Sequence, residues 1–176
     1  STSCRLRWWL LAASEATMVR ARAVLPEPVV PAMRTWATLA LGSRTNSGMP
    51  SWSSPSAFCQ DDKITIFTAG NKFAEAFAAD TGQALWRFDG LGGEVATSAV
   101  AGDGQFFFSN TGAITASFAA ADGCIGFRND NVPAPDVASP LLLEEVFLLF
   151  DSGGLGIGLD RRTGEELFEA SFNDGF

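Results

Sequence analysis

A 41-residue repeat constrains this chain more than any other feature of its sequence. Three columns of residues recur at this spacing: glycines, aromatic residues four positions later and apolar residues five positions earlier. They are Gly82, Gly123 and Gly164; Trp86, Phe127 and Phe168; and Phe77, Phe118 and Leu159. Self-similarity at a fixed period of this length predicts a repeat architecture, in which each unit buries its apolar face against its neighbours.

Each unit contains four short strand patterns separated by Gly, Asp and Asn clusters, which is the chemistry that tight turns require. The predicted strands are 54–58, 63–68, 72–78 and 83–88 in the first unit, 98–102, 105–109, 113–119 and 124–128 in the second, and 139–144, 146–150, 155–160 and 165–170 in the third. Four antiparallel strands in about 40–45 residues are typical of a β-propeller blade. The sequence therefore predicts an all-β fold of about three four-stranded blades, at 51–90, 91–131 and 132–176.

The turn between the third and fourth strands of each unit is expected to depend on a few polar and glycine residues. In the third unit, we expect Asp160 to accept hydrogen bonds from the Thr163 hydroxyl and from nearby amides. Gly164 is expected to supply a positive φ, and Phe168 to bury its ring against the neighbouring blade. The equivalent structural residues are Thr81, Gly82 and Trp86 in the first unit, and Gly123 and Phe127 in the second.

This turn pattern, Ala-x-Asp-x-x-Thr-Gly-x-x-x-Trp, resembles the tryptophan-docking motif of the PQQ-like propellers. GLDRRTGEELF matches it with Gly158 in place of Ala and Phe168 in place of Trp. AFAADTGQALW matches it with Ala78 in place of Asp. SFAAADGCIGF departs at three positions, with Ala119, Asp122 and Phe127 in place of Asp, Thr and Trp. The resemblance covers residues 51–176, and these substitutions are expected to weaken two turns and to remove indole N–H donors.

The resemblance implies several functions, because the family includes quinoprotein dehydrogenases and the lipoprotein of the outer-membrane-protein assembly machinery. The first hypothesis is a non-catalytic protein-interaction scaffold of the bacterial cell envelope, with a periplasmic location. The alternatives are a fragment of a PQQ-dependent quinoprotein oxidoreductase and the sensor domain of a membrane receptor kinase. Protein partners are expected. Self-association through open blade edges is also expected, because a propeller needs about four to eight blades to close.

Composition excludes several classes of site. The chain has no His, which excludes Ser-His-Asp catalysis and His-ligated zinc sites. Its net charge of −8 argues against a nucleic-acid groove, and no apolar run is long enough to predict a transmembrane segment. Its cysteines, Cys4, Cys59 and Cys124, include no adjacent pair and no CxxC, although a Cys59–Cys124 bridge stays open.

No catalytic or metal-binding residue is therefore predicted, and the cofactor-binding residues are unknown. The family's dehydrogenases hold PQQ with calcium beside an adjacent-cysteine disulfide and a catalytic Asp, and neither can be matched here. No cofactor is expected in this fragment, and PQQ with calcium only if the full ring is a dehydrogenase. Asp130, Asn131 and Asp136 offer oxygen atoms to a calcium ion, but an ordinary connection between blades is the favoured interpretation of that segment.

A compositional boundary near residue 50 separates the repeats from a non-propeller N-terminal segment. Residues 1–50 contain six Arg, no Lys and only two acidic residues, whereas all 15 Phe lie at or after Phe58. The short apolar run at 8–13 is below the usual length for a signal peptide. Three interpretations stay open for residues 1–50: an extension packed across the propeller, a flexible linker, and translation of a wrong reading frame.

Overall fold

The computed structural model describes residues 53–172, which form twelve β-strands and no helix. The strands are β1 (Ser56–Gln60), β2 (Lys63–Ala69), β3 (Phe73–Ala78), β4 (Ala84–Asp89), β5 (Val100–Gly102), β6 (Gln105–Ser109), β7 (Thr115–Ala119), β8 (Ile125–Arg128), β9 (Leu141–Leu142), β10 (Val146–Phe150), β11 (Leu155–Asp160) and β12 (Glu166–Ser171). They make three four-stranded antiparallel sheets in the orders β1-β2-β3-β4, β5-β6-β7-β8 and β9-β10-β11-β12. The all-β prediction is confirmed. The predicted N-terminal segment, residues 1–50, lies outside the described residues.

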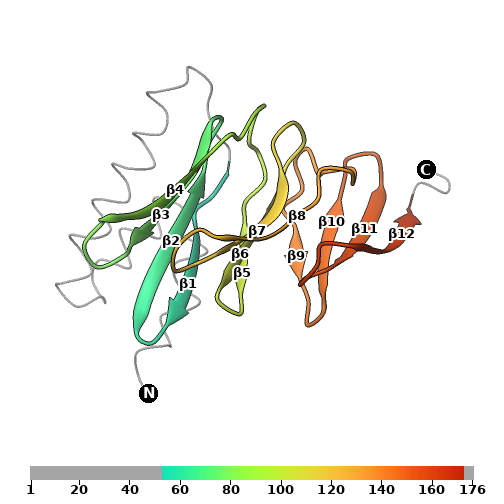
Figure 1. The fold of residues 1–176 in the computed structure, drawn as a ribbon. Coiled ribbons are helices and arrows are strands. Elements are labelled where there is room, and N and C mark those ends of the chain that lie inside the picture. Colours follow the sequence, from blue (N-terminus) through green and yellow to red (C-terminus); the bar gives the residue numbers. More distant parts are fainter. Residues whose placement is uncertain (1–52, 173–176) are drawn as a thin grey trace, which may run out of the picture.

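Each sheet resembles one propeller blade, and the three sheets follow one another side by side without closing into a ring (Figure 1).

The first strand of each sheet is the one whose ends the sequence predicts least well. The prediction was 139–144 in the third unit, but β9 spans only Leu141–Leu142. Pro140 has no backbone N–H to donate to a neighbouring strand. The amide of Leu143 already closes the turn to Val146, donating to its carbonyl oxygen at 2.8 Å.

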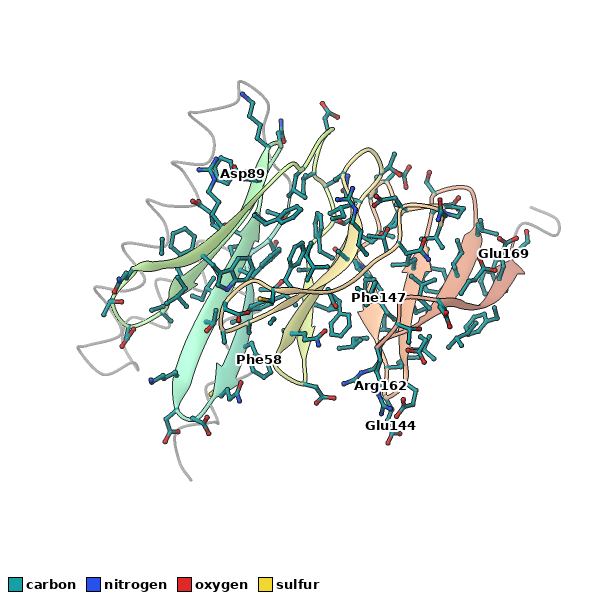
Figure 2. All side chains as sticks on the ribbon, in the orientation of Figure 1. Phe58, Asp89, Glu144, Phe147, Arg162 and Glu169 are labelled. Atoms are coloured by element: carbon teal, nitrogen blue, oxygen red, sulfur yellow. The ribbon has the colours of Figure 1, made fainter. Side chains whose placement is uncertain are left out.

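The core lies between the sheets, because the central sheet is covered on both faces. Side chains alternate across a strand, so the run Phe106-Phe107-Phe108 on β6 serves both interfaces. Phe106 and Phe108 pack in the cluster shared with the first sheet, which includes Phe67. Phe107 packs in the cluster shared with the third sheet, which includes Phe147 (Figure 2). Three consecutive buried aromatic residues on one strand are therefore explained by two neighbouring sheets.

Polar side chains fix the connections between sheets. Asn110, fully buried after β6, accepts hydrogen bonds at Oδ1 from the amides of Ala96 and Thr97 at 3.0 and 3.1 Å. Its Nδ2 donates to the Glu94 carbonyl oxygen at 2.8 Å. Asn110 thus holds the linker that joins the first sheet to the second. Such contacts satisfy the backbone groups of a loop that has no strand partner.

A second set of hydrogen bonds repeats from sheet to sheet at the first strand. The amide of Ser54 donates to Ser98 Oγ at 2.7 Å, and the amide of Ser98 donates to Ser139 Oγ at 2.9 Å. The three serines stand just before β1, β5 and β9. One serine per unit therefore ties the start of each sheet to the start of the next.

Candidate functional site at the blade interfaces

The turns between the third and fourth strands have one backbone geometry in all three sheets. Their glycines have positive φ values of 71° at Gly82, 73° at Gly123 and 72° at Gly164. The amide of each glycine donates to the carbonyl oxygen four residues earlier, at 2.8, 2.9 and 2.8 Å respectively. This is the left-handed conformation that glycine adopts without a steric penalty.

Side-chain hydrogen bonds differ among the three turns although the backbone does not. Asp160 Oδ1 accepts from the amides of Arg162 and Thr163 at 2.8 and 2.9 Å, as the sequence led us to expect. The Thr163 hydroxyl oxygen accepts from the Glu165 amide at 3.2 Å. In the other turns Thr81 and Asp122 occupy the place of Thr163, and each accepts from the amide two residues later. The first and second turns have Ala78 and Ala119 at the position of Asp160. They therefore lack these two hydrogen bonds but keep the same backbone fold.

These hydrogen bonds give a pH-dependent prediction for the third turn. The amides of Thr163 and then Arg162 lower the pKa of Asp160 below its ordinary value of 3.8. A lowered folded-state pKa contributes stability above the unfolded-state pKa, and that stability is lost as the pH falls through the folded-state pKa. We therefore expect Asp160→Asn to destabilise the protein at pH 7, and the difference from wild type to shrink as the pH falls below about 4. Urea denaturation across this pH range measures it.

Thr81→Ala is the matched control for this pH series. It removes a side-chain acceptor from the first turn, where Ala78 stands in place of Asp. No carboxylate is changed, so its effect on the free energy of unfolding should be the same at pH 7 and at pH 3. A difference between wild type and Asp160→Asn that stays constant with pH would contradict the charge-based explanation.

At the first interface, the aromatic residue of one sheet lies on the glycine turn of the next. The indole Nε1 of Trp86 on β4 donates to the Ala120 carbonyl oxygen at 3.0 Å. A Cβ atom added to Gly123 would lie only 2.6 Å from the Trp86 ring. Trp86 also packs near Phe67 and Phe118, with ring centroids 5.9 and 6.0 Å away. Gly123 is thus required both by its φ and by the ring that covers it.

At the second interface, Phe127 on β8 covers Gly164 in the same way, and a Cβ atom on Gly164 would overlap the Phe127 ring. Phe127 has no N–H to donate, but other polar contacts cross this interface. Asn129 Nδ2 donates to the Gly164 carbonyl oxygen at 2.8 Å. Arg161, whose side chain is largely buried, forms an ion pair with Asp103 of the second sheet. These contacts link the second and third sheets through polar groups, because this interface lacks the indole N–H hydrogen bond of the first interface.

The third aromatic residue of the repeat has no such cover within the described residues. Phe168 on β12 is 47% exposed, whereas Phe127 is only 6% exposed. Phe168 lies over Gly158 of its own sheet, where an added Cβ atom would overlap its ring. The prediction that Phe168 buries its ring against a neighbouring blade is therefore not met by any residue in 53–172.

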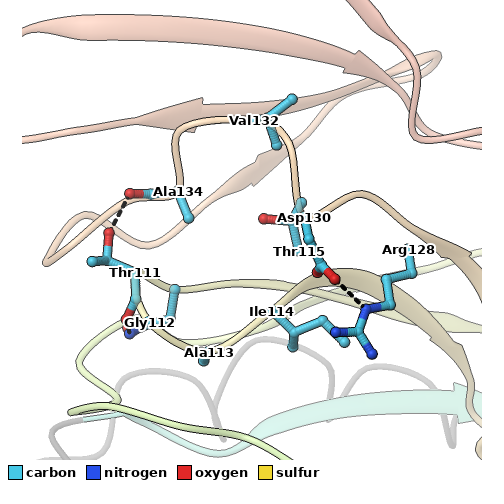
Figure 3. A pocket seen from close by; sticks show the side chains of 10 residues that line it. Thr111, Gly112, Ala113, Ile114, Thr115, Arg128, Asp130, Val132 and Ala134 are labelled. Carbon is cyan, nitrogen blue, oxygen red and sulfur yellow. Dashed lines mark hydrogen bonds and ion pairs between the residues drawn. The ribbon is translucent and has the colours of Figure 1, made fainter.

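A surface pocket of about 430 Å³ lies beside the second sheet (Figure 3). Its wall is formed by the β6–β7 turn, the end of β8 and the linker to the third sheet. The polar groups there already have partners: Arg128 pairs with Asp130 at 2.6 Å, and the Thr111 hydroxyl donates to the Ala134 carbonyl oxygen at 2.6 Å. The pocket therefore has no convergent set of unpaired polar groups to orient a ligand.

The described residues do not fit a PQQ–calcium site. No three His, Cys, Asp or Glu side chains gather in a way that could hold a metal ion within residues 53–172. Cys59 lies on β1 and Cys124 precedes β8, and no disulfide joins them. Two of the three residues considered for calcium use their carboxylates in other contacts: Asp130 pairs with Arg128, and Asp136 Oδ2 accepts from the Ser152 hydroxyl at 2.5 Å.

Sequence reasoning missed two residues that link the sheets and their linkers, Asn110 and Arg161, and it did not predict the contact of Asp136 with Ser152. The serine hydrogen bonds between sheets had a signal in the sequence, since Ser98 and Ser139 are separated by the repeat period. The other three had none, because each side chain bonds a partner in a different segment of the chain. Only the packing of the sheets brings those partners within reach.

Comparison with solved structures places this arrangement among propellers. BamB from Moraxella catarrhalis is similar at 19% identity and a TM-score of 0.52, over 72% of this chain and 38% of that chain. A europium-containing methanol dehydrogenase is similar at 13% identity and 0.55, over 67% and 24%. The quinohemoprotein alcohol dehydrogenase ADHIIG from Pseudomonas putida HK5 is similar at 12% identity and 0.54, over 69% and 20%. No protein-family model matches the sequence, and no curated protein matches it either.

The three sheets have the fold of β-propeller blades. At these identities the similarity concerns the fold alone, and it is shared by BamB and by two dehydrogenases. The chain spans well under half the length of each of these three proteins. No helix within residues 53–172 has the length and apolar character needed to cross a bilayer.

Proposed function

We propose that the chain is part of a non-catalytic protein-interaction scaffold, built from PQQ-like propeller blades and located in the bacterial cell envelope. The observation that carries the proposal is that β4, β8 and β12, the fourth strands of the sheets, each expose apolar side chains. They include Leu85 on β4, Ile125 on β8 and Leu167 on β12. Exposed apolar and aromatic side chains are characteristic of surfaces that bind proteins.

The buried polar side chains support the same proposal, because they make structural hydrogen bonds between strands and with the linker at 94–97. Thr97 Oγ1 donates to the Ser109 carbonyl oxygen at 2.5 Å, and Ser117 Oγ accepts from the Phe127 amide at 3.2 Å. Asn110 holds the first linker. Side chains placed for chemistry are usually charged groups in a cleft with altered pKa values. The lowered pKa values in residues 53–172 belong to the carboxylates of Asp122, Asp136 and Asp160, none of which is buried and each of which accepts local hydrogen bonds.

The scaffold hypothesis is tested by photocrosslinking in the envelope of cells that express the protein. A photoreactive residue at Leu85 or Ile125 is expected to form adducts with a partner protein. The same residue at Lys72, which is exposed on the β2–β3 turn, is the control and is expected to form none. Adducts from all three positions alike, or from none, would contradict a partner bound along the outer strands.

A titration distinguishes the scaffold from the quinoprotein alternative, which the similarity to two dehydrogenases favours. The purified chain is added to PQQ in the presence of calcium, and the absorbance of PQQ is followed. We expect the PQQ spectrum to stay unchanged. A saturable spectral shift that needs calcium would favour the oxidoreductase alternative over the scaffold.

A further inference from the structure

The two interfaces between sheets differ in the amount of apolar surface that they bury. Among the described residues, twelve buried apolar side chains form the cluster that the first and second sheets share, and Trp86 and Phe88 pack against it. Six form the cluster that the second and third sheets share. The free energy gained by burial scales with the apolar area removed from water. The second interface is therefore the weaker of the two in its apolar contacts.

Arg161 adds polar contacts to the second interface. It directly follows β11 in the third sheet, and its guanidinium pairs with Asp103 in the β5–β6 turn of the second sheet. The same side chain donates to the Glu144 carbonyl oxygen, in the β9–β10 turn, at 2.7 Å. Only 14% of the Arg161 side chain is exposed, and shielding from water strengthens ionic contacts. One side chain thus joins two turns of the third sheet to a turn of the second.

This contact is specific to the second interface. The residues one and two repeat periods before Arg161 are Ala120 and Ala79, which have no side-chain group to donate. At the first interface, the indole N–H of Trp86 donates to the Ala120 carbonyl oxygen instead, and a larger apolar cluster surrounds it. The interface with the smaller apolar cluster is therefore the one that contains the arginine.

We propose that Arg161 holds the third sheet against the second, and that β9–β12 open and close as one unit when its contacts break. In repeat proteins each unit contacts its neighbours, so one unit can open at the cost of its own interface. The linker at 129–140 stays fixed to the second sheet, because Thr111 binds the carbonyl oxygens of Ala134 and Pro135. The opened sheet therefore remains close enough to return. This inference goes beyond the scaffold role and does not rest on it, because it concerns motion within the chain.

Native-state hydrogen exchange of the full chain, followed peptide by peptide with mass spectrometry, tests whether β9–β12 open independently. We expect the amides in 141–171 to exchange together, and faster than those in 63–78. Phe118 lies in the cluster of the first interface, so Phe118→Leu weakens that interface alone. The substitution should speed exchange in 63–78 about fivefold or more, and leave exchange in 141–171 within about twofold.

Further variants test the role of Arg161. Arg161→Ala should speed exchange in 141–171 roughly 10-fold or more, as expected when hydrogen bonds to a charged group are lost. Arg162→Ala is the matched control, because its side chain is 76% exposed and pairs with Glu145 of its own sheet. It should change this exchange less than about twofold. Asp103→Asn should also speed exchange, but should add nothing to Arg161→Ala, because both residues act through one pair.

Three results would overturn the proposal. The first is an equal response of 141–171 and 63–78 to Phe118→Leu, which indicates that the chain unfolds as a single unit. The second is equal acceleration by Arg161→Ala and Arg162→Ala. The third is full additivity of Asp103→Asn and Arg161→Ala. Far-ultraviolet circular dichroism of each variant checks that the sheets are formed before exchange begins, so that faster exchange reports opening of a folded chain.

Discussion

Phe118→Ala is expected to lower the free energy of unfolding by about 3–5 kcal/mol, the range for removing a buried aromatic side chain. Phe118 on β7 is fully buried, and its ring centroid lies 6.0 Å from those of Phe67 and Trp86 and 5.1 Å from that of Phe88. The substitution therefore opens a cavity where the first two sheets meet. Urea denaturation followed by circular dichroism gives the change, because the slope of the transition reports the surface exposed.

Phe172→Ala is the control for that measurement. It deletes the same ring at a position that is 61% exposed, so the expected loss is below about 1 kcal/mol. Equal losses from the two variants would contradict the placement of Phe118 at the centre of the first interface. Because domains are stable by only about 5–15 kcal/mol, Phe118→Ala is also expected to populate unfolded chains without denaturant.

The second large effect is expected at the turn that Phe127 covers. Gly164→Ala should lower the free energy of unfolding by about 2–4 kcal/mol, from two additive causes. The first is backbone strain, since φ at Gly164 is +72°. The second is steric, because the new Cβ atom would overlap the Phe127 ring, which is itself buried between the second and third sheets. Thermal and urea denaturation both measure the loss.

Gly112→Ala separates these two causes. Gly112 has a φ of +73°, and a Cβ atom there would meet nothing closer than 3.7 Å. It should therefore show the strain alone, about 1–2 kcal/mol. The double variant Gly164→Ala with Phe127→Leu should recover part of the steric loss, because a smaller side chain vacates the space above the turn. If Gly164→Ala costs no more than Gly112→Ala, the ring does not press on the turn.

Strand number, strand order and the turn glycines were predictable because they depend on local chemistry. All twelve strands overlap the predicted segments, and β6, β10 and β11 match them residue for residue. Gly164 was predicted to have a positive φ because a tight turn between two strands requires it, and its φ is +72°. The ends of the first strands were predicted poorly. β9 is short because its neighbours are a proline and a turn residue. The apolar pattern of a run such as PLLLEE does not indicate where the strand begins or ends.

The candidate site was only partly predictable. The glycines and aromatic residues of the interfaces were found from their spacing, but which aromatic residue is covered was not. Trp86, Phe127 and Phe168 occupy equivalent positions in the sequence, yet only Phe168 belongs to a sheet that no further sheet follows within residues 53–172. Its exposure depends on what packs against the sheet and not on its neighbours in the chain.

The sequence by itself determined the repeat, the four-stranded unit and the turn in each unit, because hydrogen bonds between adjacent strands and the φ of a glycine involve residues close in the chain. The tertiary structure alone decided how Phe106, Phe107 and Phe108 divide between two interfaces. It also decided that Arg161 meets Asp103 and that Asn110 holds the linker at 94–97. Those contacts join separate strands and sheets, and they form only when neighbouring sheets stack and exclude water from the side chains between them.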